Sequence, residues 1–169
     1  PLNDIGALKQ TFQTYKDEIA CVIIEPIPAN NGLLLQDLSY LKFLRDITKE
    51  NGTLLIFDEV ISGFRVHFEG ASGIYNIHAD IYTFGKIIGG GMPVGAYAAN
   101  SYIMDHIAPV GNVYQAGTLS GNPVAMAAGI AQLKICMQDN FYTSLEEKAR
   151  IFVNLVQNHA NLYDYPLNI

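Results

Sequence analysis

Three short apolar runs, separated by helical patterns, constrain the fold of this 169-residue chain most strongly. The runs are residues 20–25 (ACVIIE), 53–57 (TLLIF) and 81–84 (IYTF). Runs of this length that are apolar on both faces are typical of strands in a parallel sheet covered on both sides. Helical patterns cover residues 4–16, 37–50, 123–137 and 141–160, and residues 93–99 form another apolar stretch. We therefore expect an α/β fold with a mostly parallel sheet flanked by helices.

Polar residues follow these runs at the points where the strands should end. They are Glu25, Asn30, Asp58, Glu59 and Lys86. Ligands of such sheets bind at the carboxyl ends of the strands, so these residues are the first candidates for a site.

Asp58 has two alternative interpretations. An acid at a strand end is often a solvated turn residue. The magnesium-binding acid of a P-loop ATPase also follows an apolar strand, but such an ATPase needs a GxxxxGK[ST] loop as well. The GK pair of this chain, Gly85-Lys86, is followed by Ile87 and lacks the upstream glycine spacing. The ATPase alternative therefore requires a phosphate loop outside this chain.

Lys86 lies in an apolar and glycine-rich segment, TFGKIIGGGMPVG. A lone lysine is usually a solvated surface charge, but Phe84, Ile87 and Ile88 around it predict a recessed position. Burial favours the neutral, nucleophilic amine that a Schiff-base lysine requires. Together, Asp58 and Lys86 suggest pyridoxal-phosphate chemistry, in which an acid pairs with the ring nitrogen and a lysine holds the cofactor. A buried Asp58 would then need a cationic partner.

Four segments resemble the class III, fold-type-I aminotransferases. They are residues 21–32 (CVIIEPIPANNG), 54–65 (LLIFDEVISGFR), 81–97 (IYTFGKIIGGGMPVGAY) and 113–129 (VYQAGTLSGNPVAMAAG). The resemblance implies that pyridoxal 5'-phosphate or pyridoxamine 5'-phosphate is the cofactor. It makes Lys86 the Schiff-base lysine and Asp58 the pyridinium partner. Val60 would pack on the ring, Asn30 would lie near its phenolic oxygen, and Glu25 would be a carboxylate near the site.

The same resemblance assigns a role between subunits to Gly117 and Thr118. They match a pair that reaches the cofactor phosphate of the neighbouring subunit, so a homodimer with shared active sites is implied. Arg65 belongs to the motif, and we expect a structural role for it. One departure from the family is Pro28-Ala29, where many members have Gln-Gly.

The segment YQAGTLSGNP points more narrowly to an isomerase within the family. That activity is intramolecular amino transfer on a small amino aldehyde, which forms 5-aminolevulinate for tetrapyrrole (porphyrin) biosynthesis. An ordinary class III aminotransferase, alone or in a multidomain synthetase, remains the alternative. The resemblance further implies that residues 1–169 are the central part of the cofactor-binding large domain, without the N-terminal segment, lid and C-terminal small domain. We expect this part alone to be inactive.

Composition excludes several other classes of protein. The net charge of −6 gives no basic footprint for nucleic acid or an anionic membrane. Cys21 and Cys136 are too few for a disulfide framework, and we expect both to be core thiols. The four histidines show no metal-binding spacing. A soluble, cytoplasmic enzyme with no metal, nucleic-acid or membrane partner is the expectation.

Overall fold

The computed structural model describes residues 2–167. They form two compact units, one up to Leu133 and the other from Lys134 on. Each unit is described by itself.

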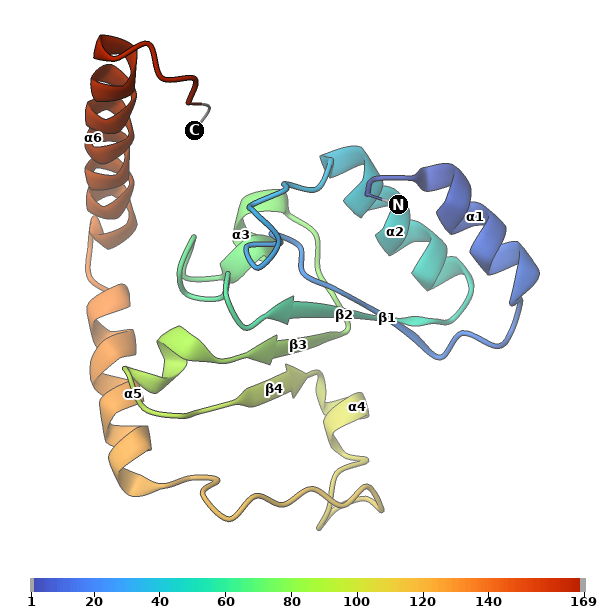
Figure 1. The fold of residues 1–169 in the computed structure, drawn as a ribbon. Coiled ribbons are helices and arrows are strands. Elements are labelled where there is room, and N and C mark those ends of the chain that lie inside the picture. The colour runs from blue at the N-terminus through green and yellow to red at the C-terminus, as the bar shows by residue number, and fades with distance from the viewer. Residues whose placement is uncertain (1, 168–169) are drawn as a thin grey trace. The chain divides into compact units, whose positions relative to one another are not determined.

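The first unit contains a four-stranded sheet in the order β1-β2-β3-β4 (Figure 1). The strands are β1 (Cys21–Ile24), β2 (Leu54–Glu59), β3 (Ile81–Phe84) and β4 (Ala96–Ala99). β1, β2 and β3 are parallel, and β4 is antiparallel to β3. The predicted mostly parallel α/β sheet is confirmed. β2 continues beyond Phe57, so Asp58 and Glu59 lie within the strand.

The helices of this unit are α1 (Ile5–Thr14), α2 (Leu38–Glu50), α3 (Gly70–Tyr75), α4 (Ser101–Met104) and most of α5 (Pro123–Cys136). Helices α1, α2 and α5 follow the sequence patterns closely. α5 begins at the predicted cap, because Asn122 Oδ1 accepts hydrogen bonds from Val124 N (3.0 Å) and Ala125 N (3.3 Å). The sequence patterns predicted neither α3 nor α4.

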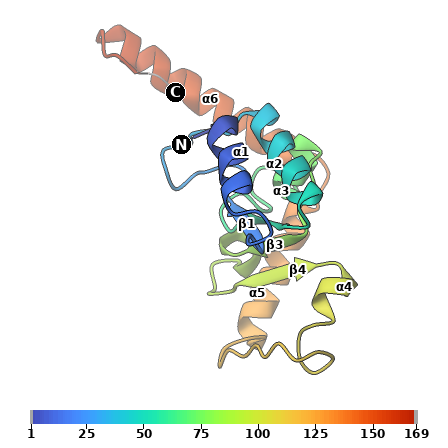
Figure 2. The same ribbon diagram turned by 90° about the vertical axis from the view of Figure 1, so that its right-hand side faces the viewer.

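One face of the sheet carries the hydrophobic core. Helices α1, α2 and α3 lie on this side of the strands in both views (Figures 1 and 2). Leu41 and Leu44 of α2 pack with Leu55 and Phe57 of β2, and all four are at most 1% exposed. Leu55 and Phe57 alternate along β2, so the intervening residues, including Asp58, belong to the opposite face.

The opposite face is more open than predicted. Ile23 of β1 is 60% exposed and Tyr97 of β4 is 39% exposed. Cys21 is also exposed, so the prediction of a core thiol there is wrong. The physical reason is that α1–α3 all pack on the face of Leu55 and Phe57. The alternate residues of the edge strand β1 are left without a covering helix in the described part of this unit.

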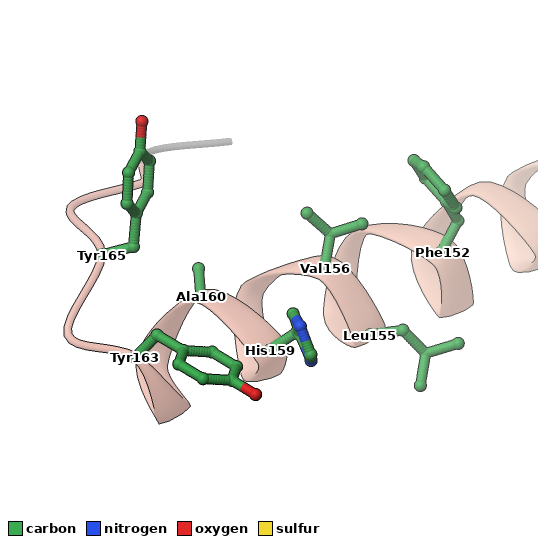
Figure 3. Close-up of a pocket in the computed structure, with 7 residues that line it drawn as sticks. All are labelled: Phe152, Leu155, Val156, His159, Ala160, Tyr163 and Tyr165. Carbon is green, nitrogen blue, oxygen red and sulfur yellow. The ribbon is translucent and has the colours of Figure 1, made fainter.

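The second unit consists of the end of α5 and the predicted long helix, α6 (Phe141–Leu162). Cys136 is buried here, as predicted. Burial, with the Cys136 thiol close by, raises the pKa of Tyr142 to about 12. Side chains of α6 and the residues after it line a pocket of about 720 Å³ (Figure 3): Phe152, Leu155, Val156, His159, Ala160, Tyr163 and Tyr165. Within residues 2–167, no helix is both long and apolar enough to span a membrane.

Candidate active site

Asp58 lies at the carboxyl end of β2 and is half-buried. Its Oδ1 accepts hydrogen bonds from Val60 N (3.0 Å) and Thr83 Oγ1 (3.3 Å). These bonds fix the carboxylate, while its Oδ2 accepts none from residues 2–167. No cation within those residues forms an ion pair with it, so the predicted cationic partner is not supplied by the described chain. Because Asp58 is only half-buried, water can solvate the charge that full burial would have left uncompensated.

Lys86 lies just past the end of β3, the strand that pairs with β2. Gly85 follows the last strand residue, and Lys86 begins a short 3₁₀ helix, η1 (Lys86–Gly89). Its side chain is exposed, so the predicted recessed position is wrong for this chain. The open face of the sheet explains this, since the described residues do not enclose the lysine.

The backbone of Lys86 has an unusual conformation, with φ at 44°. Eight non-glycine residues within the described chain have positive φ, and five of them are Asn or Asp, which tolerate it. Lysine has no such tolerance. Strained conformations of this kind concentrate at functional sites, which supports a role for Lys86 beyond that of a surface charge.

Val60, the residue after β2, packs against the end of β3. A Cβ on Gly85 would lie 3.2 Å from Val60 Cγ1, so the valine packs directly against the residue before Lys86. Asp58 pairs with Thr83 in the β2–β3 register. The structure therefore brings Asp58, Val60 and Lys86 to one edge of the sheet.

Glu25 lies at the same edge. Ile24 of β1 pairs with Phe57 of β2, and the residues that follow this pair are Glu25 and Asp58. Glu25 is half-buried, and its buried Oε2 has no hydrogen-bond partner within residues 2–167. Asn30 is exposed in the loop that follows β1. No described contact joins Asn30 to the other site residues.

Gly117 and Thr118 are exposed in the segment before α5. Gly117 helps to line a hollow of about 240 Å³, together with Pro93, Val94, Gly95, Leu119, Ser120, Gly121 and Met126. The hollow thus includes residues that follow the Gly89–Gly91 turn. No described contact joins Thr118 to Asp58 or Lys86.

Two further expectations concern residues outside this edge. Arg65 is exposed, and its guanidinium makes no hydrogen bond or ion pair with the described residues, so a structural role for its side chain has no support here. Among residues 2–167, no group of three or more His, Cys, Asp or Glu side chains has a geometry suited to a metal ion.

Glu59 is the residue to which sequence reasoning gave no role of its own. It is 1% exposed, and its carboxylate accepts hydrogen bonds from Ser62 Oγ (2.6 Å) and Ala71 N (2.8 Å). The alternation of side chains between the two faces of the strand LLIFDE could have predicted that Glu59 is buried. If the strand extends to Glu59, this residue shares the buried face with Leu55 and Phe57.

Comparison with known families identifies the chain. The family model described as "Aminotransferase class-III" matches residues 3–169. The chain belongs to the class-III aminotransferases. It does not belong to the P-loop ATPases, which were the alternative interpretation of Asp58.

Two curated relatives of this class-III aminotransferase chain have the same name. It is 55% identical over 150 residues to a glutamate-1-semialdehyde 2,1-aminomutase from Sulfurihydrogenibium sp., a match that covers 89% of the chain and 35% of the relative. It is 48% identical over 169 residues to the protein of that name from Persephonella marina, covering 100% and 40% respectively. The chain thus spans less than half the length of these relatives.

Solved structures support the fold. The chain is similar to a transaminase with PLP bound, with a TM-score of 0.83 and 33% identity; the match covers 95% of this chain and 39% of that one. The predicted fold, that of the fold-type-I aminotransferases, agrees with this likeness.

Proposed function

We propose that the full-length protein carrying this chain is a glutamate-1-semialdehyde 2,1-aminomutase. Such an isomerase converts glutamate-1-semialdehyde to 5-aminolevulinate, for tetrapyrrole biosynthesis. One observation carries the proposal: Lys86 and Asp58 occupy adjacent strand ends in a chain that is 48–55% identical to aminomutases.

The proposed cofactor is pyridoxal 5'-phosphate or its amino form, pyridoxamine 5'-phosphate. The residues fit it in three ways. Asp58 Oδ1 is held by two hydrogen bonds, which leaves Oδ2 for a protonated ring nitrogen. Val60 offers an aliphatic surface beside Gly85. The buried, unpartnered Oε2 of Glu25 is an acceptor that the described residues do not satisfy.

When bound, this cofactor draws electrons from the substrate carbon and so allows a proton to leave it. Asp58 keeps the ring nitrogen protonated, which sustains that withdrawal. Lys86 holds the cofactor at rest, and its Nζ then moves a proton between two carbon atoms as a general acid and base. The exposure of Lys86 suits this task only if further polypeptide excludes water, as a closing lid does.

The remaining assignments are part of the same proposal. Residues 1–169 would form the central part of the cofactor-binding large domain, with Asn30 near the phenolic oxygen of the cofactor. Gly117 and Thr118 would contact the cofactor phosphate of the partner subunit in a homodimer. We also propose a cytoplasmic location.

The test is product formation by the full-length protein in the absence of an added amine donor. We expect 5-aminolevulinate to form from glutamate-1-semialdehyde with the cofactor alone. Lys86→Ala should lower turnover by about 100- to 10,000-fold, the usual contribution of a general acid-base group. It should also abolish borohydride trapping of the cofactor on the peptide that contains residue 86.

Lys49→Ala is the matched control, because Lys49 is an exposed lysine at the end of α2. This variant should behave as the wild type. Strict dependence on an amine donor, with release of a keto acid, would instead indicate an ordinary class III aminotransferase. Wild-type turnover in Lys86→Ala would contradict the role of the lysine.

A further inference from the structure

Glu59 is a buried carboxylate without a cationic partner. It is 1% exposed, and no Lys, Arg or His within residues 2–167 forms an ion pair with it. Burying an unpaired carboxylate is costly unless hydrogen bonds compensate for lost solvation. Burial accordingly raises the pKa of Glu59, the hydrogen bonds from Ser62, Ala71 and Ser72 lower it, and the charge of Asp58 raises it.

The hydrogen bonds of Glu59 join the two ends of one segment, residues 60–70, which runs from the end of β2 to the first residue of α3 and is called the 60–70 loop. At the near end, Ser62 Oγ donates to Oε2 (2.6 Å). At the far end, Ala71 N in the first turn of α3 donates to Oε1 (2.8 Å) and Oε2 (3.1 Å). The carboxylate therefore closes the loop back onto the strand from which it starts.

Gly70 shows how closely the loop returns to the carboxylate. A Cβ at this position would lie 2.6 Å from Glu59 Oε1, nearer than any side-chain carbon can approach. Its φ of 62° is also in the left-handed region that favours glycine. Glycine at position 70 thus leaves space for the Glu59 carboxylate. In return, the backbone at this position loses more conformational entropy on folding than that of any other residue type would.

The 60–70 loop contacts both strands that carry the site. On the β2 side, Val60 N donates to Asp58 Oδ1 (3.0 Å). On the β3 side, a Cβ on Gly63 would lie 2.7 Å from Phe84 Cδ1, and the Phe64 and Phe84 rings are 5.5 Å apart. Phe84 is two residues before Lys86. Movement of this loop would therefore displace Val60 and the contacts of Asp58, and would loosen the end of β3.

We propose that Glu59 is a positioning residue, whose buried carboxylate holds the 60–70 loop so that Asp58, Val60 and Lys86 keep their arrangement for the cofactor. This inference rests on the proposed function, since it assumes that pyridoxal 5'-phosphate binds at these three residues. Glu59 itself lies on the core face of β2, opposite to Asp58, and does not touch the cofactor in this proposal.

The test compares Glu59→Gln and Ser62→Ala in the full-length protein. We expect Glu59→Gln to weaken pyridoxal 5'-phosphate binding by about tenfold, because groups that orient the residues around a bound group commonly account for 10- to 100-fold. The absorption maximum of the bound cofactor should also shift, since it reports the ring environment that Asp58 sets. Ser62→Ala removes one of the hydrogen bonds to the carboxylate and leaves the Ala71 N bonds in place, so about threefold weaker binding and a smaller spectral shift in the same direction are expected.

Thr48→Ala is the matched control for stability alone. Thr48 is fully buried, and its hydroxyl donates only to carbonyls of its own helix, α2. This variant should lower the melting temperature without changing the cofactor affinity or the spectrum.

The outcomes separate the inference from the proposed function. A folded Glu59→Gln protein with wild-type cofactor affinity and spectrum would overturn the positioning role. If Glu59→Gln does not fold, Ser62→Ala decides, and an unchanged affinity and spectrum there would also overturn it. Failure of the wild-type protein to bind pyridoxal 5'-phosphate would contradict the proposed function instead.

Discussion

At the residue scale, Asp58 has one oxygen fixed by protein donors, while the other accepts no hydrogen bond from residues 2–167. Val60 N and Thr83 Oγ1 both donate to Oδ1. A carboxylate held in this way keeps its orientation before a ligand arrives, which lowers the entropic cost of pairing it with a cationic ring nitrogen. The structure thus gives Asp58 a defined direction as well as a charge.

Asp58→Asn should preserve this orientation while removing the charge. The Asn Oδ1 can still accept from Val60 N and Thr83 Oγ1, so the fold should be retained. Pairing with a protonated ring nitrogen loses its charge-assisted part, and we expect about tenfold weaker pyridoxal 5'-phosphate binding with a larger fall in turnover. Equilibrium titration and steady-state rates on the full-length protein measure the two effects.

Asp46→Asn is the appropriate control for this substitution. Asp46 is an exposed aspartate on α2, remote from the strand ends. It should change neither cofactor affinity nor turnover. Wild-type kinetics in Asp58→Asn would contradict the proposed pairing with the ring nitrogen.

At the element scale, a helix or strand could be predicted only where its own residues have the pattern typical of that element. α2 has an apolar stripe and ends at Asn51-Gly52, and β3 is a bounded apolar run, so both were predictable. α3 is only six residues long, begins at a glycine, and owes its position to the carboxylate of Glu59, twelve residues earlier in the chain. A helix whose first turn is held by a tertiary contact has no local pattern from which to predict it.

α5 provides a test of the local signal at its start. Asn122→Ala removes the acceptor for Val124 N and Ala125 N, which should cost about 1 kcal/mol of unfolding free energy. Urea unfolding of the full-length protein, followed by circular dichroism, measures this loss.

The conservative control is Asn122→Asp. This change keeps an acceptor at the cap and adds a negative charge at the helix N-terminus, where it is favourable. Its stability should equal or exceed that of the wild type. Equal destabilisation by both substitutions would show that Asn122 acts through something other than its cap.

At the scale of the whole molecule, the sequence was sufficient for the class of fold and for the edge of the sheet that carries the candidate residues. It was not sufficient for their surroundings. The patterns predicted a sheet covered on both faces and a recessed Lys86, whereas Ile23 is 60% exposed and Lys86 is exposed. An apolar run indicates that a face of the sheet is covered, but it does not indicate which segment of the protein covers that face. The relatives compared above are more than twice as long as this chain.

Glu59 makes the stability of the whole molecule depend on pH in a direction opposite to that of a salt-bridged acid. Burial raises its folded-state pKa above the ordinary 4.5, so the folded protein binds the proton more tightly than the unfolded chain. Its contribution to stability is fully present below pH 4.5 and is lost as the pH rises through the folded-state pKa. We expect the free energy of unfolding of the wild type to fall over this range relative to Glu59→Gln, which cannot ionise. Urea titrations at several pH values, with the exposed Glu50→Gln as control, measure the difference, and a gap between wild type and Glu59→Gln that stays constant with pH would contradict the ionisation of Glu59 as its cause.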